Sequence, residues 1–449
     1  MQALPSSLQY STKSTSAVAR SFTSNLQPSG ALSDYKPGST VNINIPTNFN
    51  SVLSGAESVL KFSIKMNATA GVARLDSCGG HAVISKIQVY HGTNLVESTD
   101  QYNLFAKEMF DLQVSNDSIG GKYSILAGTR PDMYGLPVNT TDTVSRNMNS
   151  GALLSLTEDN TYCITLLSLL GSLGGKNFFP LFAATSAPLR LEITFVKSIY
   201  EMCCANGLTG GTPADGFTVN NIEFLASFME LSDSAMAGIL GSAGGSVFSY
   251  NTVGVRNYQD TMTAPLTGTV QKNQVIPARY SSLKSIIISM RDSEKIGVAG
   301  YYPLGTYKYN LNNYSFRIGS NSSIPSKSPD TVPNFFYELL KCVNSVSNVD
   351  HQPSIDLDSY KMDSVDAVTS SANITAGNTQ SGSFYLGLNC ENFANSDTTN
   401  FYSGLNTSND DVTCMLKCTG VGATSIRLDA FCSFDQELRF ENGVCYVTF

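Results

Sequence analysis

The sequence predicts an all-β protein made of two similar β-sandwiches in tandem, and three observations lead to this prediction. Most segments alternate apolar and polar residues over a few positions and then stop at Gly, Pro or Asn, as half-buried strands separated by turns do. The length of 449 residues suits two domains of about 200 residues, each large enough to bury its own core. Short motifs of the first half also recur, in the same order, in the second.

The first half begins with a segment that lacks the strand pattern. Residues 1–35 are rich in Ser and Thr with scattered apolar residues, and we expect a flexible N-terminal arm that orders only against a partner. Residues 36–231 are expected to form the first sandwich. Its expected strands are "TVNINIPT", "SVLKFSIKM", "KIQVYHG", "YCITLLSLLGSL", "FFPLFAA", "PLRLEITFV" and "NNIEFLASFMEL".

One helix interrupts these strands. After "KIQVYHG" and a Gly-Thr-Asn turn, Phe105, Met109 and Leu112 recur at i, i+4 and i+7, whereas Lys107 and Glu108 lie off this face. The spacing predicts an amphipathic helix of about two turns. We expect its apolar face to pack against a sandwich and not to form a ligand groove.

A second helical pattern joins the two halves. The segment "SDSAMAGILGSAGG", residues 232–245, opens with a capping Ser or Asp, continues through Ala, Met, Ile and Leu, and closes on glycines. This pattern predicts a short connecting helix. We assign residues 232–262 to a linker that contains the helix, and residues 263–449 to the second sandwich.

Internal similarity predicts a tandem duplication. "NIP" ending at Pro46 corresponds to "VIP" ending at Pro277, an offset of 231 residues (277 − 46), and "IQVYHG" corresponds to "YSFRIG". The helix "FAKEMF" corresponds to "FFYELL", "FPLFAATSAPLRLEI" to "FYSGLNTSNDDVTCM", and "FLASFMEL" to "AFCSFDQEL". The Ser of the last pair is offset by 206 residues (433 − 227). Unrelated segments would not be expected to share this order with such slowly shrinking offsets.

The size of the repeated unit indicates the kind of sandwich. A unit of about 200 residues with about eight short strands fits a jelly roll, the commonest two-sheet sandwich at that strand count. An immunoglobulin-like sandwich is the alternative, but its units are nearer 100 residues and need no helix. In both halves a long connection follows the helix, residues 115–151 and 350–382, and such loops tend to be functional surface or interface.

Charge and targeting signals narrow the function classes. Only 14% of residues are charged and the net charge is −8; charged residues are depleted where surfaces are buried against partners. No Lys/Arg-rich run is present, which argues against direct, sequence-specific nucleic-acid binding. The N-terminus lacks a signal-peptide core, so we expect a chain that is made in the cytosol and not secreted.

No residue pattern points to catalysis, a cofactor or a metal, so we predict no catalytic, cofactor-binding or metal-binding residues. His81, His91 and His351 share no metal-ligand spacing and stand in no nucleophile motif. The ten cysteines lie mostly in apolar strand-like runs, which favours buried free thiols over disulfides or zinc ligands. Two Gly-Gly-Lys runs lack the spacing of a phosphate-binding loop.

One acidic loop is a weaker candidate for a site. "DLDSYKMDSVD" brings together Asp356, Asp358, Asp363 and Asp366, and these carboxylates could hold a hard cation. The loop lacks the mid-loop glycine and terminal Glu of a calcium-binding loop. A solvated loop is therefore favoured, and cation binding stays open.

The tandem sandwiches with flanking helices resemble the double jelly-roll major capsid proteins of the adenovirus and tectivirus lineage. The likeness is greatest to those of polinton-like viruses and virophages, in size and in "YSFRIGSNSSIPSKSPDTVPNFFYELLK" and the terminal "CSFDQELRFENGVCYVTF". It spans residues 36–449 and rests on architecture and short motifs. The chain is short for that family, so the resemblance implies small tower loops.

The resemblance implies a structural protein without enzymatic activity. Three copies would form a homotrimer whose six jelly rolls make a pseudo-hexameric tile, and the tiles would assemble into an icosahedral virion shell. Expected partners are other copies, penton and minor capsid proteins, and an inner viral membrane if one exists. The virion is the expected location, after synthesis in the host cytoplasm or nucleus.

Two other functions stay open at this point. A carbohydrate- or receptor-binding tandem β-sandwich, such as a viral fibre or spike, would usually present exposed aromatic residues, but Trp is absent. A β-sandwich hydrolase is the other, and only a demonstrated activity would support it.

Overall fold

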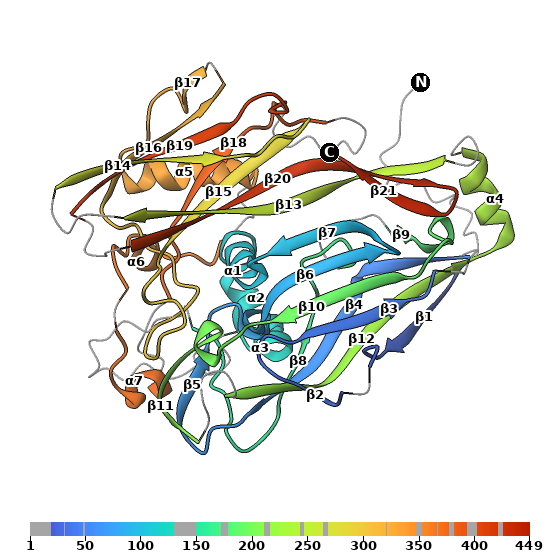
Figure 1. The fold of residues 1–449 in the computed structure, drawn as a ribbon, viewed down its shortest axis with the longest axis horizontal. Coiled ribbons are helices and arrows are strands. Elements are labelled where there is room, and N and C mark those ends of the chain that lie inside the picture. The colour runs from blue at the N-terminus through green and yellow to red at the C-terminus, as the bar shows by residue number, and fades with distance from the viewer. Residues whose placement is uncertain are drawn as a thin grey trace, which may run out of the picture.

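The two halves of the chain form two β-sandwiches that pack against each other (Figure 1). The structure is a computed structural model that describes residues 19–30, 32–47, 50–129, 150–171, 178–210, 216–242, 247–263, 268–319, 321–346, 353–365, 367–376, 381–392, 402–420 and 425–449.

The first half consists of two facing antiparallel sheets. One has the order β1-β12-β4-β8, formed by Ala19–Leu26, Phe217–Leu231, Ser51–Met66 and Asn160–Ile164, with β2 (Asp34–Tyr35) beside β12 and β9 (Phe179–Pro180) beside β4. The other has the order β3-β10-β6-β7, formed by Thr40–Ile45, Leu189–Phe195, Ile84–His91 and Asn94–Asp100. A separate pair consists of β5 (Ala70–Leu75) and β11 (Cys203–Thr209).

The second half repeats this plan. One sheet has the order β13-β20-β15-β18, formed by Val247–Thr263, Ser425–Glu441, Leu283–Asp292 and Tyr385–Asn389, with β21 (Val444–Thr448) beside β20. The other has the order β14-β19-β16-β17, formed by Thr269–Ile276, Val412–Thr419, Leu311–Ile318 and Asn321–Ile324.

The strand orders of the two halves agree position by position. When the additional short strands β2, β5, β9, β11 and β21 are set aside, the eight strands of each half, numbered in chain order, lie in sheets of order 1-8-3-6 and 2-7-4-5. The matched motifs also share backbone conformation: Gly92 after β6 has φ 60° and Gly319 after β16 has φ 56°, a left-handed conformation that Gly adopts at low cost. The predicted all-β fold with two like sandwiches is confirmed.

A helix flanks each sandwich, as predicted. Helix α1 (Tyr102–Gln113) follows β7, and α5 (Val332–Cys342) follows β17. Shorter helices are α2 (Asn116–Gly120), α3 (Lys122–Ala127), α4 (Asp233–Ser242), α6 (Leu357–Tyr360) and α7 (Ser371–Ala376), and 3-10 turns lie at Gly79–Val83, Leu181–Ala183 and Ile199–Glu201. Across the described ranges, no helix combines the length and apolar character needed to span a membrane.

Several strands were not recognised in the sequence, among them β1, β7 and β13. β7 lies between the Gly-Thr-Asn turn and α1, and only Val96 and Thr99 of its seven residues are buried, so its apolar alternation is weak. β1 lies inside the predicted arm 1–35, and most of β13 lies inside the predicted linker 232–262. Both are edge strands that pair along one side, with β12 and β20 respectively, and edge strands need no strong apolar pattern.

These strands bear on where each sandwich begins. The matching strand orders place β1 and β13 in the first position of each sandwich, which favours domain starts before Ala19 and before Val247. Helix α4 lies between the halves at the place where the connecting helix was expected. The rest of the domain division stays a prediction.

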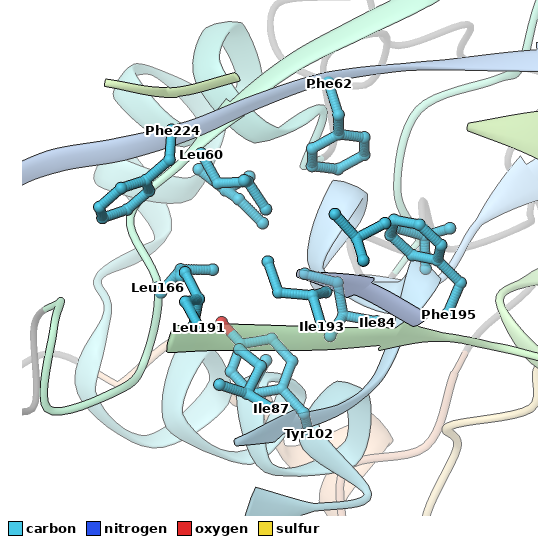
Figure 2. Packing of buried hydrophobic residues seen from close by; sticks show 14 of the residues in the cluster. Leu60, Phe62, Ile84, Ile87, Tyr102, Leu166, Leu191, Ile193, Phe195 and Phe224 are labelled. Atoms are coloured by element: carbon cyan, nitrogen blue, oxygen red, sulfur yellow. The ribbon is translucent and has the colours of Figure 1, made fainter. Parts of the chain in front are cut away.

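The apolar core of the first sandwich fills the space between its sheets. Figure 2 shows side chains from β4 and β12 facing side chains from β6 and β10, with Tyr102 of α1 beside them; labelled examples are Leu60, Phe62, Phe224, Ile84, Ile87, Leu191 and Ile193. Burying each such side chain contributes about 1.5–3 kcal/mol. The same cluster includes Phe431 and Phe440 of β20, so apolar packing continues from the first half into the second.

Candidate functional site

Helix α1 lies in the seam, which we define as the contact surface between residues 19–231 and residues 247–449. Ten of its twelve residues are buried. The Phe105 ring lies 5.5 Å from the ring of Phe431 on β20. Tyr102 belongs to the core of the first sandwich, and Leu112 to the core of the second. The expected packing of the Phe105 face is confirmed, but the helix packs on both sandwiches.

Buried polar groups cross the seam at α1. Lys107 Nζ donates to Asp111 Oδ2 at 2.6 Å and to Ser383 Oγ at 2.9 Å. The Tyr385 hydroxyl donates to Asp111 Oδ2 at 2.8 Å, and burial, with the nearby Asp111 charge, raises the pKa of that hydroxyl. Tyr385 therefore stays a hydrogen-bond donor. Lys107 and Asp111, the buried ion pair of α1, are both hydrogen-bonded to the second half.

Glu108 is the exception among these buried groups. Its side chain is fully buried, and neither carboxyl oxygen has a hydrogen-bond partner in the described structure. Burial, with repulsion from Asp111 and Asp429, raises the pKa of Glu108 well above its usual range. A charged carboxylate in this place would be costly, so burial favours the neutral form of Glu108.

Next to Glu108, a buried carboxylate on β20 holds two guanidinium groups. Arg291 Nη2 on β15 lies 2.7 Å from Asp429 Oδ2, and Arg427 Nη2 lies 3.1 Å from Asp429 Oδ1. Arg291 Nη1 also donates to the carbonyl of Pro303, and its Nη2 reaches Gln101 Oε1 at 3.4 Å. Since Gln101 directly precedes α1, this network links the second sandwich to the start of the helix.

A second group of contacts crosses the seam at β5. Arg74 is fully buried and donates to the carbonyls of Gly151, Ile374 and Thr375 at 2.9, 2.8 and 3.0 Å. The last two lie in α7 of the second half. Asp76 accepts a bond at 3.0 Å from the backbone N–H of Leu304. The loops of the two halves therefore interlock through backbone groups.

The opposite end of the seam is closed by the C-terminal strand. His91 Nδ1 accepts a bond at 3.1 Å from the backbone N–H of Cys445 on β21. Asn94 Nδ2 donates to the carbonyl of Cys445 at 3.2 Å, and the rings of Phe179 and Phe440 lie 5.7 Å apart. With contacts at both ends and at α1, the two sandwiches form one continuous packed unit.

The histidines and thiols have structural surroundings. His81 lies 3.0 Å from the Tyr102 hydroxyl, and burial lowers the pKa of its ring to about 3, so it is neutral. His351 lies outside the described residues. All ten cysteines are free thiols and eight are buried, as predicted. Within the described ranges, no group of three or more His, Cys, Asp or Glu side chains could hold a metal ion.

The described carboxylates of the acidic loop are paired with other groups of the same chain. Asp356 caps α6 by accepting from Ser359 N at 2.7 Å, Asp358 pairs with Lys361 at 2.6 Å, and Asp363 pairs with Lys308 at 2.6 Å. Asp366 lies outside the described residues. The three described carboxylates are thus engaged with protein groups, which favours the solvated-loop reading over a cation site.

Sequence reasoning missed the seam itself. It placed Lys107 and Glu108 off the packing face, as if they met solvent, yet both are fully buried. The one local signal is the i,i+4 pairing of Lys107 with Asp111, and that spacing is equally common on exposed helices. The second-half groups that meet this part of α1 are remote in sequence: Ser383 bonds Lys107, Tyr385 bonds Asp111, and Asp429 lies near Glu108.

This chain is similar to known proteins in its fold and not in its sequence. No family model and no curated protein matches the sequence. Solved structures do match along nearly the whole chain. VP54 of PBCV-1, fitted into a cryo-EM reconstruction of the virophage Sputnik, has a TM-score of 0.63 at 9% identity, covering 98% of this chain and 99% of that one. The strand orders and this full-length match decide the architecture. The chain has the double jelly-roll fold.

Two further solved structures that match this chain are major capsid proteins. The Faustovirus major capsid protein matches with a TM-score of 0.60 at 9% identity, covering 96% of this chain and 92% of that one. The mavirus major capsid protein matches with a TM-score of 0.54 at 11% identity, covering 100% and 95%. In this double jelly roll, the seam joins the two sandwiches into one body.

Proposed function

We propose that the chain is the major capsid protein of a virus and assembles into trimeric, pseudo-hexameric tiles of an icosahedral shell. The observation that carries the proposal is the full-length structural match to two proteins described as major capsid proteins. Both sandwiches are covered, so the likeness is to the paired unit and not to one common domain.

The repeated strand order supports a pseudo-sixfold tile. Two sandwiches with the same strand order give each chain two similar but distinguishable edges, and three chains related by threefold symmetry then present six. The seam supports it too, because a tile needs its two sandwiches in a fixed relation. Buried pairs such as Lys107–Asp111 with Tyr385 fix that relation.

The proposal extends to partners and location. Other copies of the chain are the first partner, and the low charged fraction of 14% suits tile edges that are polar and uncharged. Penton and minor capsid proteins, and an inner membrane where present, are further proposed partners. The virion is the proposed location, after synthesis in the host cytoplasm or nucleus. The role is structural, with no catalytic step, no cofactor and no sequence-specific binding of nucleic acid.

Analytical ultracentrifugation and negative-stain microscopy of the purified full chain test the proposal. We expect a species of three times the 48.1 kDa chain mass, and hexagonal particles in the images. A stable monomer at micromolar concentration, together with the absence of hexagonal particles, would contradict the proposal. A monomer that binds on a glycan array would favour the carbohydrate-binding alternative instead, which no observation in the structure favours.

A further inference from the structure

A cavity of about 350 Å³ opens at the seam, beside the turn that precedes α1. Its first-half wall comes from the start of β6, residues 100–103, the end of β10 and the segment after it. Its second-half wall comes from β15, β20 and residues 296–304. The cavity is therefore a property of the paired sandwiches, since neither half alone encloses it. Its volume lies in the range of about 300–1,000 Å³ that is usual for small-molecule sites.

Cationic side chains outnumber carboxylates in this cavity. The charged lining residues are Lys86, Lys197, Arg291 and Arg427 against Asp100 and Glu201. Lys86 Nζ is neutralised by Asp100 Oδ1 at 3.0 Å. In the described part of the chain, Lys197 has no ion-pair partner, and its backbone N–H, not its ammonium group, is bonded to Glu201 Oε2 at 2.9 Å.

The two guanidinium groups share one carboxylate. Asp429, fully buried behind the cavity, bonds both Arg291 and Arg427, so one directly bonded carboxylate serves two positive charges. Glu201, whose carboxyl accepts from the Lys197 backbone, adds a more distant negative charge near Arg427. The Arg427 side chain is 22% exposed, against 3% for Arg291, and it is the one that the cavity can offer to a ligand. Burial and the adjacent Arg291 charge lower the pKa of Arg427, against the opposing effects of Asp429 and Glu201.

Gln101 adds a conformational observation. It lies in the cavity lining with φ 53°, a left-handed conformation that is uncommon for residues other than Gly. Its Oε1 is the acceptor for Arg291 Nη2 at 3.4 Å. Non-Gly residues in this conformation cluster at ligand sites, where the surrounding structure holds them.

We propose that this cavity binds a small phosphate-bearing anion, held by Arg427 of the second sandwich and Lys197 of the first. A guanidinium group presents several N–H donors in a planar arrangement that matches phosphate oxygens, and a lysine ammonium adds a point charge. The cavity is larger than a phosphate group needs, so an organic phosphate fits as well as inorganic phosphate. The ligand bridges the halves and stabilises the folded chain.

The test is isothermal titration of the full-length chain with inorganic phosphate, pyrophosphate and glycerol phosphate, each at fixed ionic strength. We expect saturable binding of at least one, and a matching rise in melting temperature that sodium chloride does not reproduce. Arg427→Gln is expected to weaken binding about tenfold or more, because it removes the charge-assisted contacts. Tighter binding of glycerol phosphate would identify an organic phosphate or a lipid headgroup as the source, and tighter binding of the inorganic probes a free phosphate.

Arg439→Gln is the matched control. Arg439 lies on the same strand, also pairs with a carboxylate two residues later, Glu441 at 3.2 Å, and does not line the cavity. Absence of saturable binding in the wild-type chain, or equal weakening in both variants, would overturn the proposal. If Arg427→Gln does not fold, Lys197→Gln replaces it, and unchanged affinity in that variant would overturn the proposal. Neither the titration nor the melting temperature depends on trimer formation. The ligand proposal can therefore fail or succeed independently of the capsid role.

Discussion

The ammonium group of Lys107 lies 2.6 Å from a carboxyl oxygen of Asp111 one helical turn away, and both side chains are buried between the two sandwiches. Ser383 and Tyr385 of the second half complete the bonding of this pair. A buried ion pair contributes little to stability by itself, but removing one member leaves an uncompensated charge.

Lys107→Met is therefore expected to destabilise the folded chain by about 3–5 kcal/mol, because Asp111 would stay buried with only the Tyr385 hydroxyl as a side-chain donor. Urea-induced unfolding measures the change in free energy. The double variant Lys107→Met with Asp111→Leu removes both charges and should recover much of the loss. Equal losses in the single and double variants would show that the charge left behind is not the cause.

Glu108→Gln should make the chain less sensitive to alkaline pH. Burial raises the pKa of Glu108, so the folded state keeps a proton that the unfolded state releases near the ordinary pKa. The stability from this group is complete below the unfolded pKa and is lost as pH rises through the folded pKa. Gln keeps the shape and cannot ionise.

Melting temperatures at about pH 5 and about pH 9 check this sign. The melting temperature of the variant, relative to that of the wild type, should rise as the pH rises. Parallel curves for the two proteins would mean that Glu108 does not titrate differently in the folded and unfolded states. Glu441→Gln, an exposed carboxyl paired with Arg439, serves as the control and should follow the wild type.

Arg74→Met should loosen α7. The substitution removes the donors for the carbonyls of Gly151, Ile374 and Thr375, and each buried carbonyl left unsatisfied costs about 1–3 kcal/mol. Limited proteolysis should then cut faster within residues 371–376. Arg190→Met, which breaks a part-exposed pair with Glu192, should cost less than about 1 kcal/mol. Equal cleavage rates at α7 in the two variants would refute the prediction.

Gly387 lets α5 approach β18 closely. A Cβ placed there would lie 2.6 Å from Cys342 Sγ and 2.8 Å from the Cα of Leu339, so Gly387→Ala should cost about 1–3 kcal/mol through overpacking. Gly238 in α4 has open space around it, and Gly238→Ala should be neutral or stabilising by up to about 1 kcal/mol. Thermal unfolding compares the two, and equal shifts would show that close packing at Gly387 is not limiting.

The sequence alone determined the class of elements and their repetition. Strand alternation, turn glycines such as Gly92 and Gly319, and the Phe105 and Phe335 helices are local patterns, and the structure has them at matching positions. It did not reveal β1 or β13, because an edge strand such as β1, mostly exposed to solvent, carries little apolar signal.

Only the tertiary structure decided what joins the halves. Lys107, Glu108 and Asp111 look like the polar side of an amphipathic helix, yet they are buried against the second half. Ser383 and Tyr385, which bond Lys107 and Asp111, and Asp429, which lies near Glu108, come from strands and loops more than 250 positions away. Local patterns report which face of an element is apolar, whereas the burial of a charge depends on the partners that the fold brings to it. The local sequence pattern was enough to predict the two sandwiches, whereas the seam depends on how they pack against each other.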